Sequence, residues 1–138
     1  MDANELMIGD WVNGWDGRWH PVCVSTISSY PEHRPTIVAC GGYGYSLVDQ
    51  VKPIQITNEI LRKNGWIGCS SAFNCYFSDY GFCLKLESDG FIMRRGTCIN
   101  TIGGGVIGGE VILKNPLKYV HELQHALRLA GIKKEIVL

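Results

Sequence analysis

The sequence of 138 residues lacks an excess of charge of either sign, because thirteen lysines and arginines are balanced by thirteen aspartates and glutamates. A general nucleic-acid binder needs surplus basic residues to displace phosphate counterions, so the zero net charge argues against that class. No polybasic run is present that would hold an anionic membrane surface. Charged residues make up only 19% of the chain and apolar residues 46%, which is enough apolar material for folding and excludes wholesale disorder.

Long apolar runs are also missing. The longest candidate, around residues 103–113, is interrupted by five glycines and Glu110, and it falls short of the roughly 18–20 residues of a membrane span. The first five residues include the acids Asp2 and Glu5, and the apolar stretch of a signal peptide does not follow them. We therefore expect a cytoplasmic protein that neither binds nor crosses a membrane.

Closely paired cysteines are absent as well. No C-x-x-C pair occurs, and a zinc ribbon or a thioredoxin-like redox motif would need one. We expect reduced thiols that behave as small apolar residues on strands. The six cysteines are Cys23, Cys40, Cys69, Cys75, Cys83 and Cys98.

Short strands separated by turns are the main pattern of the first fifty residues. Alternating apolar residues between turn signals predict strands over 7–13, 19–27, 36–40 and 45–51. Four or five strands in so short a stretch indicate an SH3-like small β-barrel or an antiparallel sheet over residues 1–52.

A connector and a short helix are expected next. Residues 51–56 are predicted to be an extended connector, because Pro53 lacks the backbone donor that a central strand requires. Thr57 then supplies an N-cap oxygen for a short helix, and Gly65 ends that helix.

The remainder of the chain predicts further antiparallel strands and a second helix. Strands over 82–86 and 91–94 flank an Asp-Gly turn, which is a hairpin signal. An amphipathic helix is expected over 117–130 and a closing edge strand over 134–138. The predicted fold class is therefore α+β, with residues 53–138 joining residues 1–52 in a single domain.

The sharpest local motif is H-E-x-x-H at His121, Glu122 and His125. In zinc hydrolases the two histidines bind the metal while the glutamate activates water. Here a helical wheel places all three on the polar side of the predicted helix. A metzincin would also need Gly and His where Arg128 and Gly131 stand. We expect solvent-facing histidines and no cofactor, and a zinc site remains the alternative.

A second motif, G-x-G-x-x-G, occurs at residues 103–108. A dinucleotide site would need a helix directly afterwards to hold the pyrophosphate. Residues 109–113 are largely β-branched and apolar instead. We therefore expect a glycine-rich turn or bulge between strands.

Aromatic residues gather in the N-terminal part of the chain. Near barrel loops, such residues form grooves that bind peptides or stack on bases, and they equally form the core of a small barrel. Both interpretations stay open at this point. The residues are Trp11, Trp15, Trp19, Tyr43 and Tyr45.

Three ordered segments carry a resemblance to a known family. They read NELMIGDWV, VKPIQITNEILRKNGW and LKYVHELQHAL. Together they resemble a family of small uncharacterised proteins encoded by phages, prophages and mobile elements of gut bacteria, whose members read like ELRIGNWV, V-x-PIPLTEEWLLKFGF and IKYVHQLQNLYFALTG. In that pattern Gln and Asn stand at the positions of Glu122 and His125, so these two residues resemble local variation. The tryptophan of the EWL segment is absent from residues 56–60.

The resemblance implies a mobile-element protein in the cytoplasm of a bacterial host, and no established activity comes with it. The sequence favours a non-enzymatic accessory or interaction protein that binds a host or phage component. A variant is a counter-defence protein that sequesters a small nucleotide, with the glycine loops and aromatic residues as its cage. The alternatives are a zinc-dependent hydrolase with Glu122 as base and His121 and His125 as ligands, and a structural virion component.

Overall fold

The computed structural model describes residues 1–28, 35–39, 42–47, 49–68, 75–78, 81–96, 98–99, 106–107, 110–113 and 115–138. The chain divides into two compact units. Unit 1 is Met1–Gln55 with Tyr119–Gln124, and unit 2 is Ile56–Lys118 with His125–Leu138. The single domain expected from the sequence stays a prediction, because compact units alone do not define folding domains.

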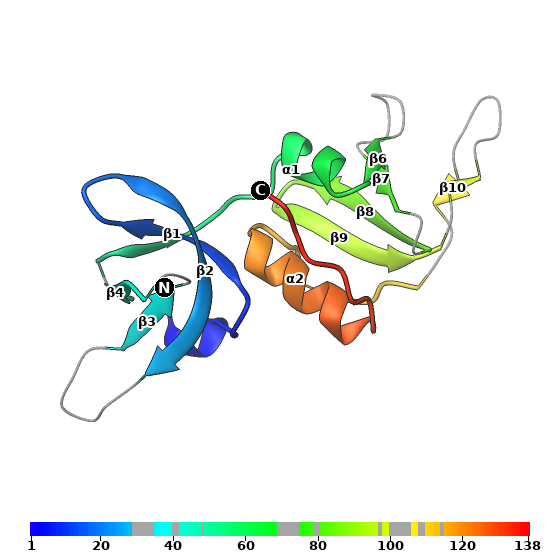
Figure 1. Cartoon of the computed structure of the whole chain (residues 1–138). Coiled ribbons are helices and arrows are strands. Elements are labelled where there is room, and N and C mark those ends of the chain that lie inside the picture. Colours follow the sequence, from blue (N-terminus) through cyan, green and yellow to red (C-terminus); the bar gives the residue numbers. More distant parts are fainter. Residues whose placement is uncertain are drawn as a thin grey trace. The chain divides into compact units, whose positions relative to one another are not determined.

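Unit 1 is built around one antiparallel sheet with the strand order β4-β3-β2-β1-β5 (Figure 1). Its elements are the 3₁₀ helix η1 (Ala3–Glu5), β1 (Trp11–Trp15), β2 (Trp19–Ser28), β3 (Thr36–Ala39), β4 (Gly44–Ser46) and β5 (Val51–Pro53). The long β2 pairs with β1 over one part and with β3 over the other, with a register shift between Val24 and Thr26. Among the described strands no ladder joins β4 to β5, so the sheet is open. The predicted antiparallel sheet is confirmed, and the closed barrel is not formed.

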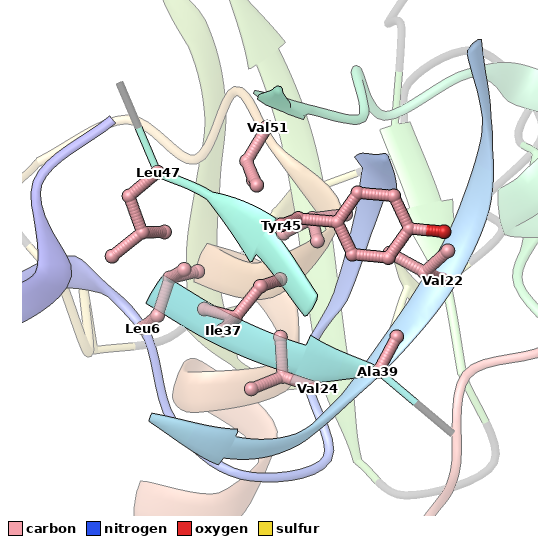
Figure 2. Packing of buried hydrophobic residues seen from close by; sticks show 9 residues of the cluster. Leu6, Val22, Val24, Ile37, Ala39, Tyr45, Leu47 and Val51 are labelled. Carbon is pink, nitrogen blue, oxygen red and sulfur yellow. The ribbon is translucent and has the colours of Figure 1, made fainter. Parts of the chain in front are cut away.

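The core of unit 1 lies on the inner face of this sheet. Alternate residues of each strand point into it, as the pleat requires. The cluster consists of Leu6, Val12, Val22, Val24, Ile37, Ala39, Tyr45, Leu47 and Val51 (Figure 2). The Tyr45 ring packs against Gly14, where a Cβ would lie only 2.8 Å from the ring. The sheet therefore curls far enough to bring β4 against β1.

Two strand predictions in unit 1 are corrected by the structure. The strand expected over 7–13 begins only at Trp11, because the preceding residues form a turn in which the Asp10 carboxylate accepts the Met7 N–H at 2.7 Å. The connector expected over 51–56 contains β5, which pairs with β1. Pro53 is tolerated there because it is the last residue of the strand, opposite Val12.

Unit 2 contains a four-stranded antiparallel sheet, a two-stranded sheet and a short helix. Its elements are α1 (Asn58–Lys63), β6 (Ile67–Gly68), β7 (Cys75–Phe77), β8 (Phe82–Glu87), β9 (Gly90–Arg95), β10 (Cys98–Ile99) and β11 (Val106–Ile107). Thr57 caps α1 as predicted, since its Oγ1 accepts the Ile60 N–H at 3.2 Å. The Asp-Gly hairpin between β8 and β9 is also confirmed, with Gly90 at φ +140°. The glycines of the 103–108 motif lie outside the described residues.

Helix α2 (Val120–Leu129) begins in unit 1 and ends in unit 2. It starts later than predicted because Leu117 and Phe91 exchange backbone hydrogen bonds, each of 2.8 Å. No described helix has the length and apolar composition that crossing a bilayer requires.

The C-terminal segment is not the predicted edge strand. The buried Asn64 side chain holds it instead, accepting the Val137 N–H at 2.8 Å and donating to the Val137 carbonyl at 2.7 Å. Lys134 also donates to the Asn64 carbonyl. The predicted α+β class, with its short helix, further strands and C-terminal helix, is confirmed.

Candidate functional site

The outer face of the β5-β1-β2 part of the sheet carries an unusual concentration of aromatic side chains. Strand alternation turns Val12 and Val22 inward and places their neighbours outward. We call this surface the tryptophan face, and it consists of Trp11, Asn13 and Trp15 from β1, Trp19 and Pro21 from β2, and Lys52 from β5.

Trp15 and Trp19 are the two exposed aromatic residues of this face. They are direct cross-strand partners at the end of the β1–β2 hairpin. Their ring centroids lie 5.2 Å apart with the planes inclined by 53°. The two residues remain 40% and 38% exposed, so the contact between the rings leaves much of each indole in water.

Lys52 adds the charged group of the tryptophan face. Its backbone lies opposite Asn13 in the β1–β5 ladder, and its Nζ lies 4.4 Å from the centroid of the Trp19 ring. This is cation–π geometry. Sequence reasoning missed Lys52, because assigning residues 51–56 to a connector gave them no alternation and therefore no outer face.

A chain of polar side chains runs beneath the hairpin. The Asp16 carboxylate lies 3.4 Å from His20 Nδ1, and His20 Nε2 lies 3.3 Å from the Tyr45 hydroxyl. The Arg18 carbonyl also lies 3.3 Å from Nδ1, and because a carboxylate and a carbonyl only accept, Nδ1 is the nitrogen that donates to them. Burial raises the pKa of Tyr45, and Asp16 and Tyr43 add to the rise. The two ring nitrogens of His20 thus link the hairpin end to Tyr45.

The five aromatic residues singled out from the sequence do not form one surface. Trp15 and Trp19 lie together in solvent, and Trp11 is half-buried on the same face. Tyr43 is 70% exposed in the turn between β3 and β4. Tyr45 belongs to the core, where the core interpretation placed it.

Gln124 holds the strand from which Trp11 and Trp15 project. Its buried side chain accepts the Trp11 N–H at 2.9 Å through Oε1 and donates to the Gly9 carbonyl at 2.9 Å through Nε2. The amide thus pairs with the backbone as a neighbouring strand would. No local sequence pattern signals this role, because it depends on residues more than one hundred positions apart.

The expectation that the H-E-x-x-H histidines face solvent is wrong for His121. That residue is only 3% exposed, and its ring stacks on Tyr119 with centroids 5.8 Å apart and planes 7° apart. The helical wheel assumed one buried side, whereas α2 is buried around most of its circumference. His125 is half-buried.

Glu122 has a structural role at the start of α2. Its Oε2 accepts the Tyr119 N–H at 2.9 Å, which is one half of a capping box. In the described part of the chain, no group of three or more His, Cys, Asp or Glu side chains is placed to hold a metal ion. His121 and His125 therefore have no third zinc ligand among those residues.

No protein-family model, no curated protein and no solved structure matches this chain. The tryptophan face has to be interpreted from its own geometry.

Proposed function

We propose that the protein is a non-enzymatic interaction protein that binds a partner through the tryptophan face. The observation that carries the proposal is the exposed, mutually contacting pair Trp15 and Trp19 on the outer face of a sheet. Tryptophan is among the residues most enriched at the centres of protein interfaces.

The energetics of the hairpin support this interpretation. A cross-strand aromatic pair stabilises a sheet by about 0.2–1 kcal/mol relative to alanine. A β-branched pair would give part of that stability without exposing two indoles to water. Half-solvated antiparallel sheets normally present polar residues on the solvent side. An exposed indole pair is therefore explained better by a binding partner than by the stability of the hairpin.

The surface is also well supported from behind. The Gly14–Tyr45 contact fixes β1 against the core, and Gln124 fixes the start of β1. Because the surface is already rigid, less conformational entropy is lost when a partner binds to it.

The origin of the protein in a phage or mobile element is part of the proposal. Parts of the three segments that resemble the phage family are paired with one another in unit 1. Val12 pairs with Pro53, the Val120 N–H donates to the Ile54 carbonyl at 2.8 Å, and Gln124 binds the backbone of β1. These contacts give the three segments a common structural role in this chain, and the proposed origin itself rests on the sequence resemblance.

Paired affinity capture tests the proposal. The baits are the wild-type protein, the double variant Trp15→Thr/Trp19→Thr, and Leu129→Gln, which removes a 78% exposed apolar side chain from unit 2. We expect a protein from a gut-bacterial lysate to be retained by the wild type and by Leu129→Gln, and to be lost from the double variant.

The captured protein is then purified and titrated against each bait by calorimetry. Loss of two interface tryptophans should weaken binding by at least about tenfold. Equal affinity for the wild type and the double variant would contradict the proposal, as would capture of nothing together with turnover of a substrate.

A further inference from the structure

We propose that the occupant of the tryptophan face is an acidic protein segment that brings a carboxylate to Lys52 beside an apolar side chain on the indoles. This inference rests on the proposed function, and it adds the chemical class of the partner.

The ammonium group of Lys52 has different surroundings from those of three other described lysines. Lys63, Lys85 and Lys118 lie 3.9, 2.6 and 3.1 Å from the carboxylates of Glu59, Glu87 and Asp89. Lys52 lies over an indole ring instead, and no ion pair joins it to a carboxylate within the described ranges.

Covering the tryptophan face removes water from this ammonium group. The cation–π contact with Trp19 offsets only part of the lost hydration, because it contributes about 0.5–2 kcal/mol. A buried charge left without an acceptor costs several kcal/mol in general. A purely apolar partner would therefore bind more weakly, because the Lys52 ammonium would lose its hydration without gaining an acceptor. A carboxylate on the partner would form an ion pair with this ammonium group.

The same geometry disfavours a nucleotide cage. A nucleobase is held best between two parallel aromatic rings. The centroids of the Trp15 and Trp19 rings are only 5.2 Å apart and the ring planes are inclined by 53°, so the two rings do not form a parallel slot. The Lys52 ammonium already lies over the Trp19 ring, where a base would have to stack. An aliphatic or proline side chain covers such a tilted pair of rings without having to enter a slot between them.

Selection from a random twelve-residue peptide display library tests the inference. Wild-type protein should enrich peptides in which Asp or Glu stands close to an apolar residue. Lys52→Glu should reverse the preference toward Lys and Arg, and Lys52→Met, which keeps the aliphatic stem over Trp19, should lose the acidic preference. The control is Lys133→Glu, which makes the same charge change at an exposed lysine of unit 2 and should leave the preference unchanged.

The most enriched acidic peptide is then titrated against each folded variant. Its affinity should fall by about tenfold or more in Lys52→Glu and by less than about twofold in Lys133→Glu. Enrichment that depends on Trp15 and Trp19 but shows no acidic preference would overturn the inference and leave the proposed function standing. No enrichment above the Trp15→Thr/Trp19→Thr variant would overturn both. Tighter binding of oligothymidylate or adenosine diphosphate than of any selected peptide would replace the protein partner with a nucleic-acid or nucleotide ligand.

Discussion

The two long hairpins of the molecule, β1–β2 and β8–β9, share a construction and differ in the surface they present. Each has antiparallel strands and a buried inner face, with Val12 opposite Val22 in the first and Leu84 opposite Met93 in the second. The inner faces follow the ordinary rule that one side of such a sheet supplies the core.

The outer faces are chemically opposite. In β8–β9 the outward positions hold Lys85 and Glu87, whose charged groups lie 2.6 Å apart, with Arg94 on the neighbouring strand. In β1–β2 the corresponding positions hold tryptophans. Cys83 lies on the same face of β8–β9, opposite Arg94, and is only 1% exposed, so this face is not wholly exposed to water. Its exposed end nevertheless carries an ion pair where the end of β1–β2 carries two indoles in contact, and this difference is consistent with the binding role proposed for Trp15 and Trp19.

The largest expected effect concerns two glycines, one in each hairpin, at which a side chain would meet a neighbouring element. At Gly90 a Cβ would lie 2.7 Å from the Leu117 carbonyl oxygen, and φ is +140°. At Gly14 it would meet the Tyr45 ring, which is able to shift. We expect Gly90→Ala to lower the free energy of unfolding by about 2–4 kcal/mol and Gly14→Ala by about 1–3 kcal/mol. Urea unfolding measures both, and a greater loss for Gly14→Ala would contradict the ranking.

The next largest effect is expected from removing the Gln124 hydrogen bonds that hold the backbone at the start of β1, which leaves the tryptophan side chains unchanged. Gln124→Leu leaves the Gly9 carbonyl and the Trp11 N–H without their partner, so we expect a loss of about 1–3 kcal/mol. Gln55→Leu makes the same change at an exposed glutamine and should cost less than about 0.5 kcal/mol. Hydrogen exchange of the Trp11 amide should accelerate in the first variant only. Unchanged protection of that amide would show that Gln124 does not anchor β1.

Local signals predicted the elements that local interactions form. Alternation located β2, the Thr57 cap located α1, and Asp89-Gly90 located the β8–β9 turn. The predictions failed where distant residues decide the outcome. The C-terminal segment is held by Asn64, 73 positions away, instead of pairing as a strand. The burial of His121 likewise could not follow from a helical wheel, which contains no neighbouring elements.

The candidate site was only partly predictable for the same reason. Composition alone drew attention to Trp15 and Trp19, and the period of two along each strand is enough to place them on one face. Placing Tyr45 in the core required knowing that β4 curls against β1. Placing Lys52 beside Trp19 required recognising that β5, although it ends in proline, pairs with β1.

A smaller effect on stability is expected from exchanging the outer-face residues themselves. Trp15→Thr/Trp19→Thr should cost no more than about 1 kcal/mol of unfolding free energy, because only one exposed cross-strand pair is lost. Retention on a hydrophobic-interaction column should nevertheless fall clearly. Lys85→Thr/Glu87→Thr, the matched change in β8–β9, should not shorten retention. A large loss of stability in the tryptophan variant would identify the pair as a structural element and weaken the distinction between the hairpins.

The smallest expected effect is a pKa shift, measured by a titration that compares the outward-facing lysines Lys85 and Lys52. The hydrogen bond and the charge of Lys85 lower the pKa of Glu87, whereas Lys52 lies over an indole. NMR of the carboxyl carbons should therefore give Glu87 a midpoint below the value of about 4.3 for a free glutamate. Lys85→Met should raise that midpoint, because it removes the two largest causes of the lowered pKa and leaves only the charge of Arg94 to lower it. Because the folded-state pKa is the lower one, the pair stabilises the fold above the unfolded pKa, and this contribution is lost as the pH falls through the folded value. Lys52→Met should shift no carboxylate comparably. A carboxyl midpoint in unit 1 that rises in Lys52→Met would reveal a partner for Lys52 within the chain itself, and the ammonium would no longer require an acid from outside.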